Sequence, residues 1–145
     1  MSHNAQDTAS VRAWFDQWGH CVANVDFASA RTMFDDTVSG FGTYKDTVRG
    51  LDALEAGQWR SIWPTIKEFK FLTDNVDAIV SEDRLMCYAA VLWSSVGVRE
   101  NGEHYDRPGR ATVALKRADL NAPWRGYHTH FSEFPQERQK SFGGA

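Results

Sequence analysis

Apolar residues recur every three or four positions along the first part of the chain, which is the spacing of one helix face. After Ser10, which can cap a helix, this face consists of Val11, Trp14, Phe15, Trp18, Val22 and Val25. Asp26 is suited to cap a second, short helix. A third helical pattern begins after Gly50, and Pro64 ends or kinks it. Its partly apolar face is made of Leu51, Leu54, Gln58, Trp59, Ile62 and Trp63.

Strand patterns dominate the rest of the chain. The expected strands cover Val38–Tyr44, Glu68–Thr73, Asn75–Val80, Arg84–Val98, Glu103–Lys116 and Trp124–Phe134. The pair Asn101-Gly102 predicts a hairpin, because both central residues of a type I′ turn need positive φ. Pro108-Gly109 predicts a bulge in the returning strand.

This order of elements predicts an α+β fold, and 145 residues are the length of a single domain. The N-terminal helices would pack on a long, strongly curved, mostly antiparallel sheet and form a cone with an open mouth. Such a mouth is a natural ligand site. We expect a core over about residues 10–135, with a frayed polar N-terminus and a frayed tail at Gly143-Gly144-Ala145.

Charge and composition narrow the classes of partner. Sixteen Lys and Arg stand against 19 Asp and Glu, and this balance disfavours a nucleic-acid binder. No apolar run approaches the ~18 residues that span a bilayer, and residues 1–10 lack a signal-peptide core. Cys21 and Cys87 lie among apolar neighbours and are expected to be buried, reduced thiols of a cytoplasmic protein. No phosphate loop or dinucleotide motif is present, so no cofactor is implied.

The C-terminal part of the chain resembles a known family. The run GRATVALKR, a loop and the run WRGYHTHFSEFP are similar to the end of SnoaL-like proteins of the nuclear transport factor 2-like superfamily. The likeness is greatest to the branch that includes the association domain of calcium/calmodulin-dependent kinase II. The corresponding positions are Arg110, Thr112, Trp124, His128, His130 and Ser132.

The resemblance extends over about Ser10–Pro135, and both the run GFGT (Gly40–Thr43) and the helix start at Gly50 agree with it. It implies the cystatin-like cone fold. It does not imply one activity, because the superfamily holds isomerases, dehydratases, cyclases, hydrolases, lyases and plain binding or assembly domains.

His128 and His130 are the first candidates for chemistry. Residues i and i+2 of a strand share a face, so both imidazoles and Ser132 should point to one side. Inside the cone they could act as an acid/base pair, because histidine titrates near neutral pH. Alternatively, they could form a hydrogen-bonded patch or a subunit interface. A third reading makes them two metal ligands, with His104 or Asp106 as another, although we assign no metal.

Arg110 is the second candidate and shares strand parity with Thr112. Directed into the cone, its guanidinium could hold a carboxylate or an oxyanion. Directed outward, it could form a salt bridge on the surface or in a dimer interface. We expect the inward direction. Arg107 lies on the same hairpin, but the expected bulge leaves its direction open.

Aromatic side chains could line the cavity, since the chain has nine Phe, six Trp and four Tyr. Most of them should be core residues. Together with Thr112 and Ser132, the aromatic residues that we expect to bind substrate are Tyr44, Trp63, Tyr88, Trp93 and Tyr105. The chain has no clear equivalent of the Asp/Tyr pair of ketosteroid isomerases, which disfavours steroid isomerisation.

These features favour a cofactor-independent enzyme, an isomerase, dehydratase or lyase that acts on a small aromatic or anionic compound. Arg110 would stabilise negative charge, and His128 or His130 would move a proton. The alternative is a non-catalytic domain for ligand binding or oligomerisation. In either case we expect a cytoplasmic homodimer paired through the sheet. Its partner would be a small molecule, with neither nucleic acid nor membrane.

Overall fold

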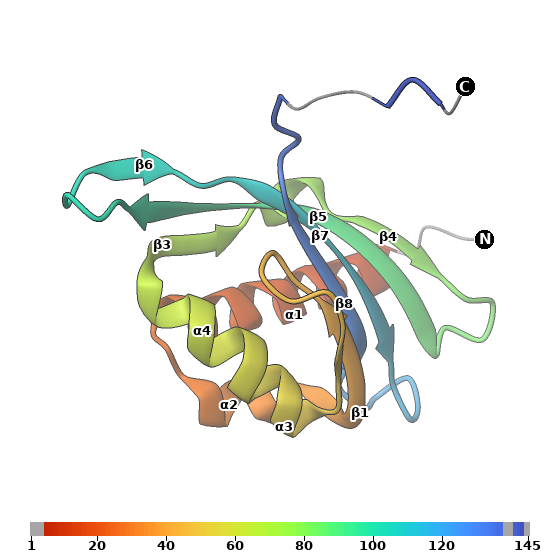
Figure 1. Cartoon of the computed structure of the whole chain (residues 1–145). Coiled ribbons are helices and arrows are strands. Elements are labelled where there is room, and N and C mark those ends of the chain that lie inside the picture. The colour runs from red at the N-terminus through yellow and green to blue at the C-terminus, as the bar shows by residue number, and fades with distance from the viewer. Residues whose placement is uncertain (1–4, 138–140, 144–145) are drawn as a thin grey trace.

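The computed structural model describes residues 5–137 and 141–143 and has the predicted α+β architecture (Figure 1). The helical elements are α1 (Ala5–Ala23), α2 (Phe27–Arg31), α3 (Leu51–Leu54), the π-helix η1 (Glu55–Trp59), α4 (Arg60–Ile62), and the 3₁₀ turns η2 (Trp63–Thr65) and η3 (Thr73–Asn75). The strands are β1 (Phe34–Phe41), β2 (Val48–Arg49), β3 (Ile66–Phe71), β4 (Asp77–Val80), β5 (Met86–Val98), β6 (His104–Asp106), β7 (Gly109–Lys116) and β8 (Arg125–Glu133).

All described strands belong to one sheet, in the order β2-β1-β8-β7-β5-β3, with β4 and β6 also paired to β5. The sheet is mixed, because β1 runs parallel to β8 while the other pairs are antiparallel. It is not closed into a barrel. The helices gather on one side of the curved sheet (Figure 1). We call the side of the sheet that faces them the inner face and the opposite side the outer face.

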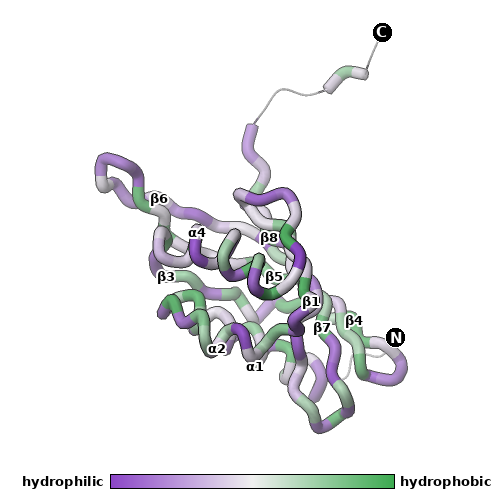
Figure 2. The backbone as a smooth tube through the Cα atoms, turned by 60° about the horizontal axis from the view of Figure 1, so that its bottom comes forward, coloured by the Kyte–Doolittle hydropathy of each residue, from purple (hydrophilic) through white to green (hydrophobic). Residues whose placement is uncertain are grey.

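Strict alternation along β5 and β7 divides their side chains between the two faces. Odd-numbered positions from Cys87 to Ser95 are buried on the inner face, whereas Tyr88 and Leu92 are exposed on the outer face. The inner residues form one core with the apolar stripe of α1, including Phe15 and Trp18. Beyond this core, the tip of the hairpin between β5 and β6 is hydrophilic (Figure 2).

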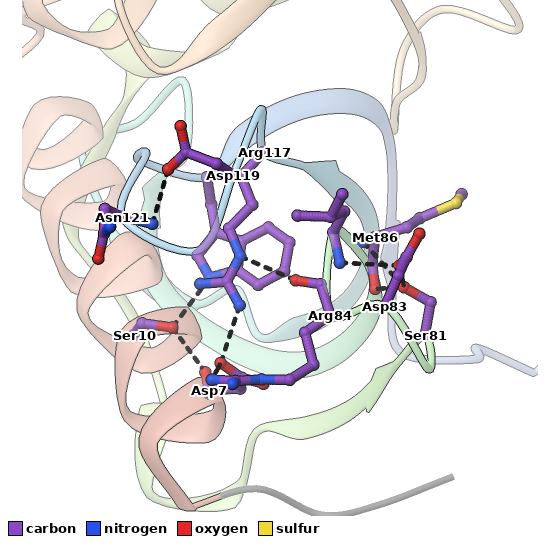
Figure 3. Close-up of polar contacts among 11 residues, drawn as sticks. Asp7, Ser10, Ser81, Asp83, Arg84, Met86, Arg117, Asp119 and Asn121 are labelled. Carbon is purple, nitrogen blue, oxygen red and sulfur yellow. Dashed lines mark hydrogen bonds and ion pairs between the residues drawn. The ribbon is translucent and has the colours of Figure 1, made fainter.

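Helix α1 begins at Ala5 rather than after Ser10, so the expected start was wrong. Asp7 is 1% exposed, and its carboxylate accepts bonds from Arg84 Nε at 2.7 Å and Arg117 Nη2 at 2.9 Å (Figure 3). The hydrogen bonds from Arg84 and Arg117 hold the pKa of Asp7 below its ordinary value of 3.8, although burial opposes them. Ser10 does not cap the helix; its hydroxyl donates to the Asp7 carbonyl and accepts from Trp124 Nε1. These contacts anchor the first turns of α1.

Residues 5–9, for which we expected fraying, are part of α1. The same expectation for Met1–Asn4 and for Gly144-Ala145 falls outside the described residues. Strand β1 also begins earlier than predicted, at Phe34, because its first part already pairs with β8. The hairpin at Asn101-Gly102 is confirmed, but its turn is not of type I′, because Gly102 has a φ of +89° and Asn101 does not have a positive φ. The helix start at Gly50, with φ of +88°, is confirmed.

Both cysteines are buried and free, as expected. Burial raises the pKa of the Cys87 thiol to about 11, so this side chain is a packing residue rather than a nucleophile. Within the described residues, no helix has the length and hydropathy needed to cross a membrane.

Candidate functional site

A narrow cavity of about 40 Å³ lies between the helices and the inner face of the sheet. It adjoins a wider mouth of about 480 Å³, and both are lined by Ile62, Ile66 and Arg107. A water molecule needs roughly 10–15 Å³, so the cavity holds a few waters or a small chemical group, while the mouth can hold a larger body. The aromatic residues that line the cavity are Trp18, Trp59, Trp63, Phe69, Trp93 and Phe131.

Arg107 is the charged group of this cavity. It is only 8% exposed, and its guanidinium carbon lies 5.2 Å from the ring centroid of Trp93. Nη2 donates to Thr43 Oγ1 at 3.2 Å. The nearest carboxylate is that of Glu133, 4.0 Å from Nε and 40% exposed. Glu133 therefore compensates this buried cation only at the outer limit of an ion pair, and an incompletely compensated buried charge is costly.

The backbone of Arg107 is fixed by the neighbouring strand. Its N–H donates to the Ser95 carbonyl at 2.9 Å, and its carbonyl accepts from Ser95 Oγ at 2.7 Å. Ser95 is a buried residue of the inner face. This pairing holds Arg107 on the inner side of the break between β6 and β7.

Gln58 supplies the second polar group of the cavity. It lies in the π-helix η1 and is 8% exposed, and its Oε1 has no hydrogen-bond partner among the described residues. A Cβ on Gly42 would lie 2.4 Å from Gln58 Nε2, so the amide packs directly on a glycine. The Nε1 donors of Trp18 and Trp93 are also unpartnered. Buried polar groups usually have partners, so these three atoms are the ones that a bound molecule could satisfy.

The two histidines and Ser132 share one face of β8, as predicted, but that face is the outer one. Thr129 and Phe131 point inward instead. Helices cover only the side that carries the apolar residues of the alternating strands, so the polar positions of β8 point away from the cavity. Of the readings left open for His128 and His130, the geometry therefore does not support the acid/base pair inside the cone.

Arg110 and Thr112 also lie on the outer face, which corrects the inward direction expected for Arg110. The alternation of β7 buries Gly109 and Ala111 and leaves Arg110 exposed. Its Nε donates to Ser132 Oγ on the adjacent strand at 3.1 Å. An outer groove of about 510 Å³ is lined by Arg110, Thr112, His130 and Ser132 together with Asn75, Asp77 and Leu92.

His128 is a half-buried polar residue of the same outer face. Its Nδ1 lies 2.9 Å from Ser39 Oγ, and the Phe41 ring packs edge-on against both imidazoles. Burial, and secondly the neighbouring His130, hold the pKa of His128 below its ordinary value of 6.5. His128 is therefore neutral at pH 7.

The metal reading has no geometric support, because the described residues contain no group of three His, Cys, Asp or Glu side chains that could hold an ion. His104 and Asp106 belong to β6, which pairs with β5 and not with β8.

The predicted aromatic residues divide between the two faces. Trp63 and Trp93 line the cavity, and Tyr44 and Tyr105 line the mouth. Tyr88 lies on the outer face, because even positions of β5 point away from the helices.

Gln58 and Thr43 were not predicted as site residues, and Arg107 was left without a direction. Each had a signal in the sequence. Gln58 is a polar residue on an otherwise apolar helix face. Thr43 directly follows Gly42, the glycine on which the Gln58 side chain packs. Arg107 lies two positions before Gly109, so strand alternation puts both residues on the same buried face.

Comparisons with known proteins agree with this fold. A family model described as a SnoaL-like domain matches residues 11–137, while no curated protein matches. An NTF2-like superfamily protein from Salmonella enterica has a TM-score of 0.76 at 16% identity, covering 97% of this chain and 99% of its own. A ketosteroid isomerase-like protein from Erwinia carotovora has a TM-score of 0.74 at 12% identity, covering 92% and 100%.

A candidate calcium/calmodulin dependent protein kinase II association domain from Xanthomonas campestris has a TM-score of 0.72 at 14% identity, covering 94% of this chain and 91% of its own. At such identities the likeness shows the fold alone.

Proposed function

This chain belongs to the SnoaL-like domain family, and we propose that it binds a small organic acid in the cavity and mouth on the inner side of its sheet. The observation that carries this proposal is Arg107, a guanidinium that is 8% exposed inside an aromatic wall and lies 4.0 Å from its nearest carboxylate. An anionic ligand would supply a closer counter-charge than Glu133 does.

The surroundings of Arg107 favour a carboxylate with an apolar body. A guanidinium presents a planar fork of donors that matches the two oxygens of a carboxylate. The mouth beside it offers Ile62, Ile66 and Tyr105 as apolar contacts, and Lys45 adds a second positive charge. A hydrophobic body in such a site would be oriented by a few polar groups, as is usual for small-molecule pockets.

A catalytic version of this proposal is an isomerase, dehydratase or lyase step in the same cavity. The residues that line the cavity carry no carboxyl or imidazole group, and His128 and His130 lie on the other face. The proton carrier would then be Glu133, whose carboxylate is the nearest one to Arg107, at 4.0 Å from Nε. A reaction that survives Glu133→Gln at full rate would exclude this version.

The proposal is tested by comparing acids with their neutral amides on the intact protein. Hydrocinnamate and benzoate should raise the melting temperature in a concentration-dependent way, because a ligand of the native state stabilises it by mass action. Hydrocinnamamide and benzamide have the same apolar body without the charge and should raise it much less. Equal shifts from acids and amides would contradict an anion site.

We also propose that the outer face pairs with a second copy of this chain. Exposed apolar side chains on it include Phe41, Ile79, Tyr88 and Leu92, and such patches mark interaction sites. Arg110 and Asp77 line the same groove, so a twofold axis could bring opposite charges together. Sedimentation should show a dimer that Tyr88→Lys converts to a monomer; a wild-type monomer at high concentration would contradict the pairing.

A further inference from the structure

We infer that the bound acid carries a hydroxyl group close to its carboxylate and that Gln58 recognises this hydroxyl. The inference rests on the proposed binding of an acid at Arg107. Its starting point is the buried Oε1 of Gln58, which has no hydrogen-bond partner among the described residues. An anion bound at Arg107 would not provide one.

An amide oxygen only accepts hydrogen bonds. A carboxylate is also an acceptor, so its oxygens cannot partner Gln58 Oε1 and would repel it. The ligand must therefore present a donor at this point. An ammonium group would place a second positive charge beside the buried Arg107, which leaves a neutral donor.

The indole groups narrow the choice further. Trp18 and Trp93 offer unpartnered N–H donors to the same cavity in which Gln58 offers an acceptor. A hydroxyl can donate its proton to Gln58 Oε1 and accept from an indole N–H through one oxygen atom. One small group of this kind also suits a cavity of about 40 Å³.

The position of the hydroxyl follows from the size of the cavity. Gln58 and Arg107 both line the same space of about 40 Å³. Two residues that line so small a cavity lie close together. The ligand groups that meet them must be near each other as well. A 2-hydroxy acid with its apolar body directed into the mouth meets this requirement.

Three acids of similar size separate this inference from the proposed function in a calorimetric titration. Hydrocinnamate has no hydroxyl, phenyllactate has one next to the carboxylate, and phloretate has one at the far end of the ring. Phenyllactate should bind about tenfold tighter than hydrocinnamate, which corresponds to one added hydrogen bond to a buried group. Phloretate should gain no such advantage.

The role of Gln58 is tested with Gln58→Leu, which removes the acceptor and keeps an apolar side chain of similar size. This variant should bind phenyllactate no more tightly than hydrocinnamate, so the tenfold preference is lost. Asn75→Leu, which removes an amide from the outer groove, is the matched control and should keep the preference. If Gln58→Leu melts too low to titrate, Gln58→Met provides the same test.

Each outcome decides one of the two claims. If wild-type protein binds hydrocinnamate and phenyllactate equally, the hydroxyl inference is wrong and water satisfies Gln58, while acid binding stands. If the preference survives in Gln58→Leu, Gln58 is not the recognising residue. If none of the three acids binds, the proposed function fails and the inference fails with it.

Discussion

Arg107 and Arg110 lie on one hairpin, separated only by Pro108 and Gly109, and point to opposite faces of the sheet. Arg107 is buried in the inner cavity and donates to Thr43, whereas Arg110 is exposed on the outer face and donates to Ser132. The two arginines therefore form a natural pair of test and control positions. A ligand bound inside the cone depends on Arg107, and a partner bound outside depends on Arg110.

Gly42 gives the first prediction. Replacing it with alanine would place a Cβ 2.4 Å from Gln58 Nε2 and 2.7 Å from its Cδ, so the amide must move. We expect a loss of about 1–3 kcal/mol in the free energy of unfolding, as for other overpacked sites. Urea denaturation measures this loss. At Gly57 the nearest atom is Val48 Cγ1 at 3.6 Å, so Gly57→Ala is the control that should cost much less.

The ion pairs of Asp7 with Arg84 and Arg117 give the second prediction. Asp7→Asn removes the charge that compensates Arg84 and Arg117, and the Arg117 side chain is only 5% exposed. We expect it to lower the free energy of unfolding by about 3–5 kcal/mol, because a buried cation is left without its partner. Asp52 pairs with Arg31 at 2.7 Å but is 94% exposed, so Asp52→Asn should have a much smaller effect in the same urea titration. Similar losses at both positions would contradict a structural role of the Asp7 cluster.

His128 gives a prediction on pH. Its pKa in the native state lies below the ordinary value of 6.5, so the unfolded chain binds this proton more readily. The corresponding stability is present above pH 6.5 and is lost as the pH falls through the native pKa. The melting temperature should therefore decrease from pH 7 toward pH 5, and His128→Gln should reduce the slope. His20→Gln, on the exposed side of α1, should leave it unchanged.

Much of the fold follows from patterns that the sequence displays openly. Alternation placed His128, His130 and Ser132 on one face, and the pair Asn101-Gly102 located a hairpin. The early start of α1 was missed because Asp7 depends on Arg84 and Arg117, which are distant in sequence. Local helix signals contain no information on such partners.

The candidate site was less predictable, because a strand pattern shows which residues share a face but not which face is covered. The sequence left open whether the histidines lie inside the cone, and the structure puts them on the side of the sheet that the helices do not cover. The direction of the Arg107 side chain could be predicted only if strand alternation continued through Pro108, and a bulge there would have reversed it. The position of Gln58 in the site depends on a π-helix and on a long-range contact with Gly42.

The central claim, that an organic acid binds at Arg107, is tested most directly by titrating hydrocinnamate into wild type, Arg107→Met and Arg110→Met by calorimetry. Methionine keeps an unbranched apolar side chain and removes the charge. We predict that Arg107→Met weakens binding by at least about tenfold, the value of a charge-assisted hydrogen bond, and that Arg110→Met binds like the wild type. A loss in Arg110→Met with none in Arg107→Met would place the acid on the outer face and contradict the account.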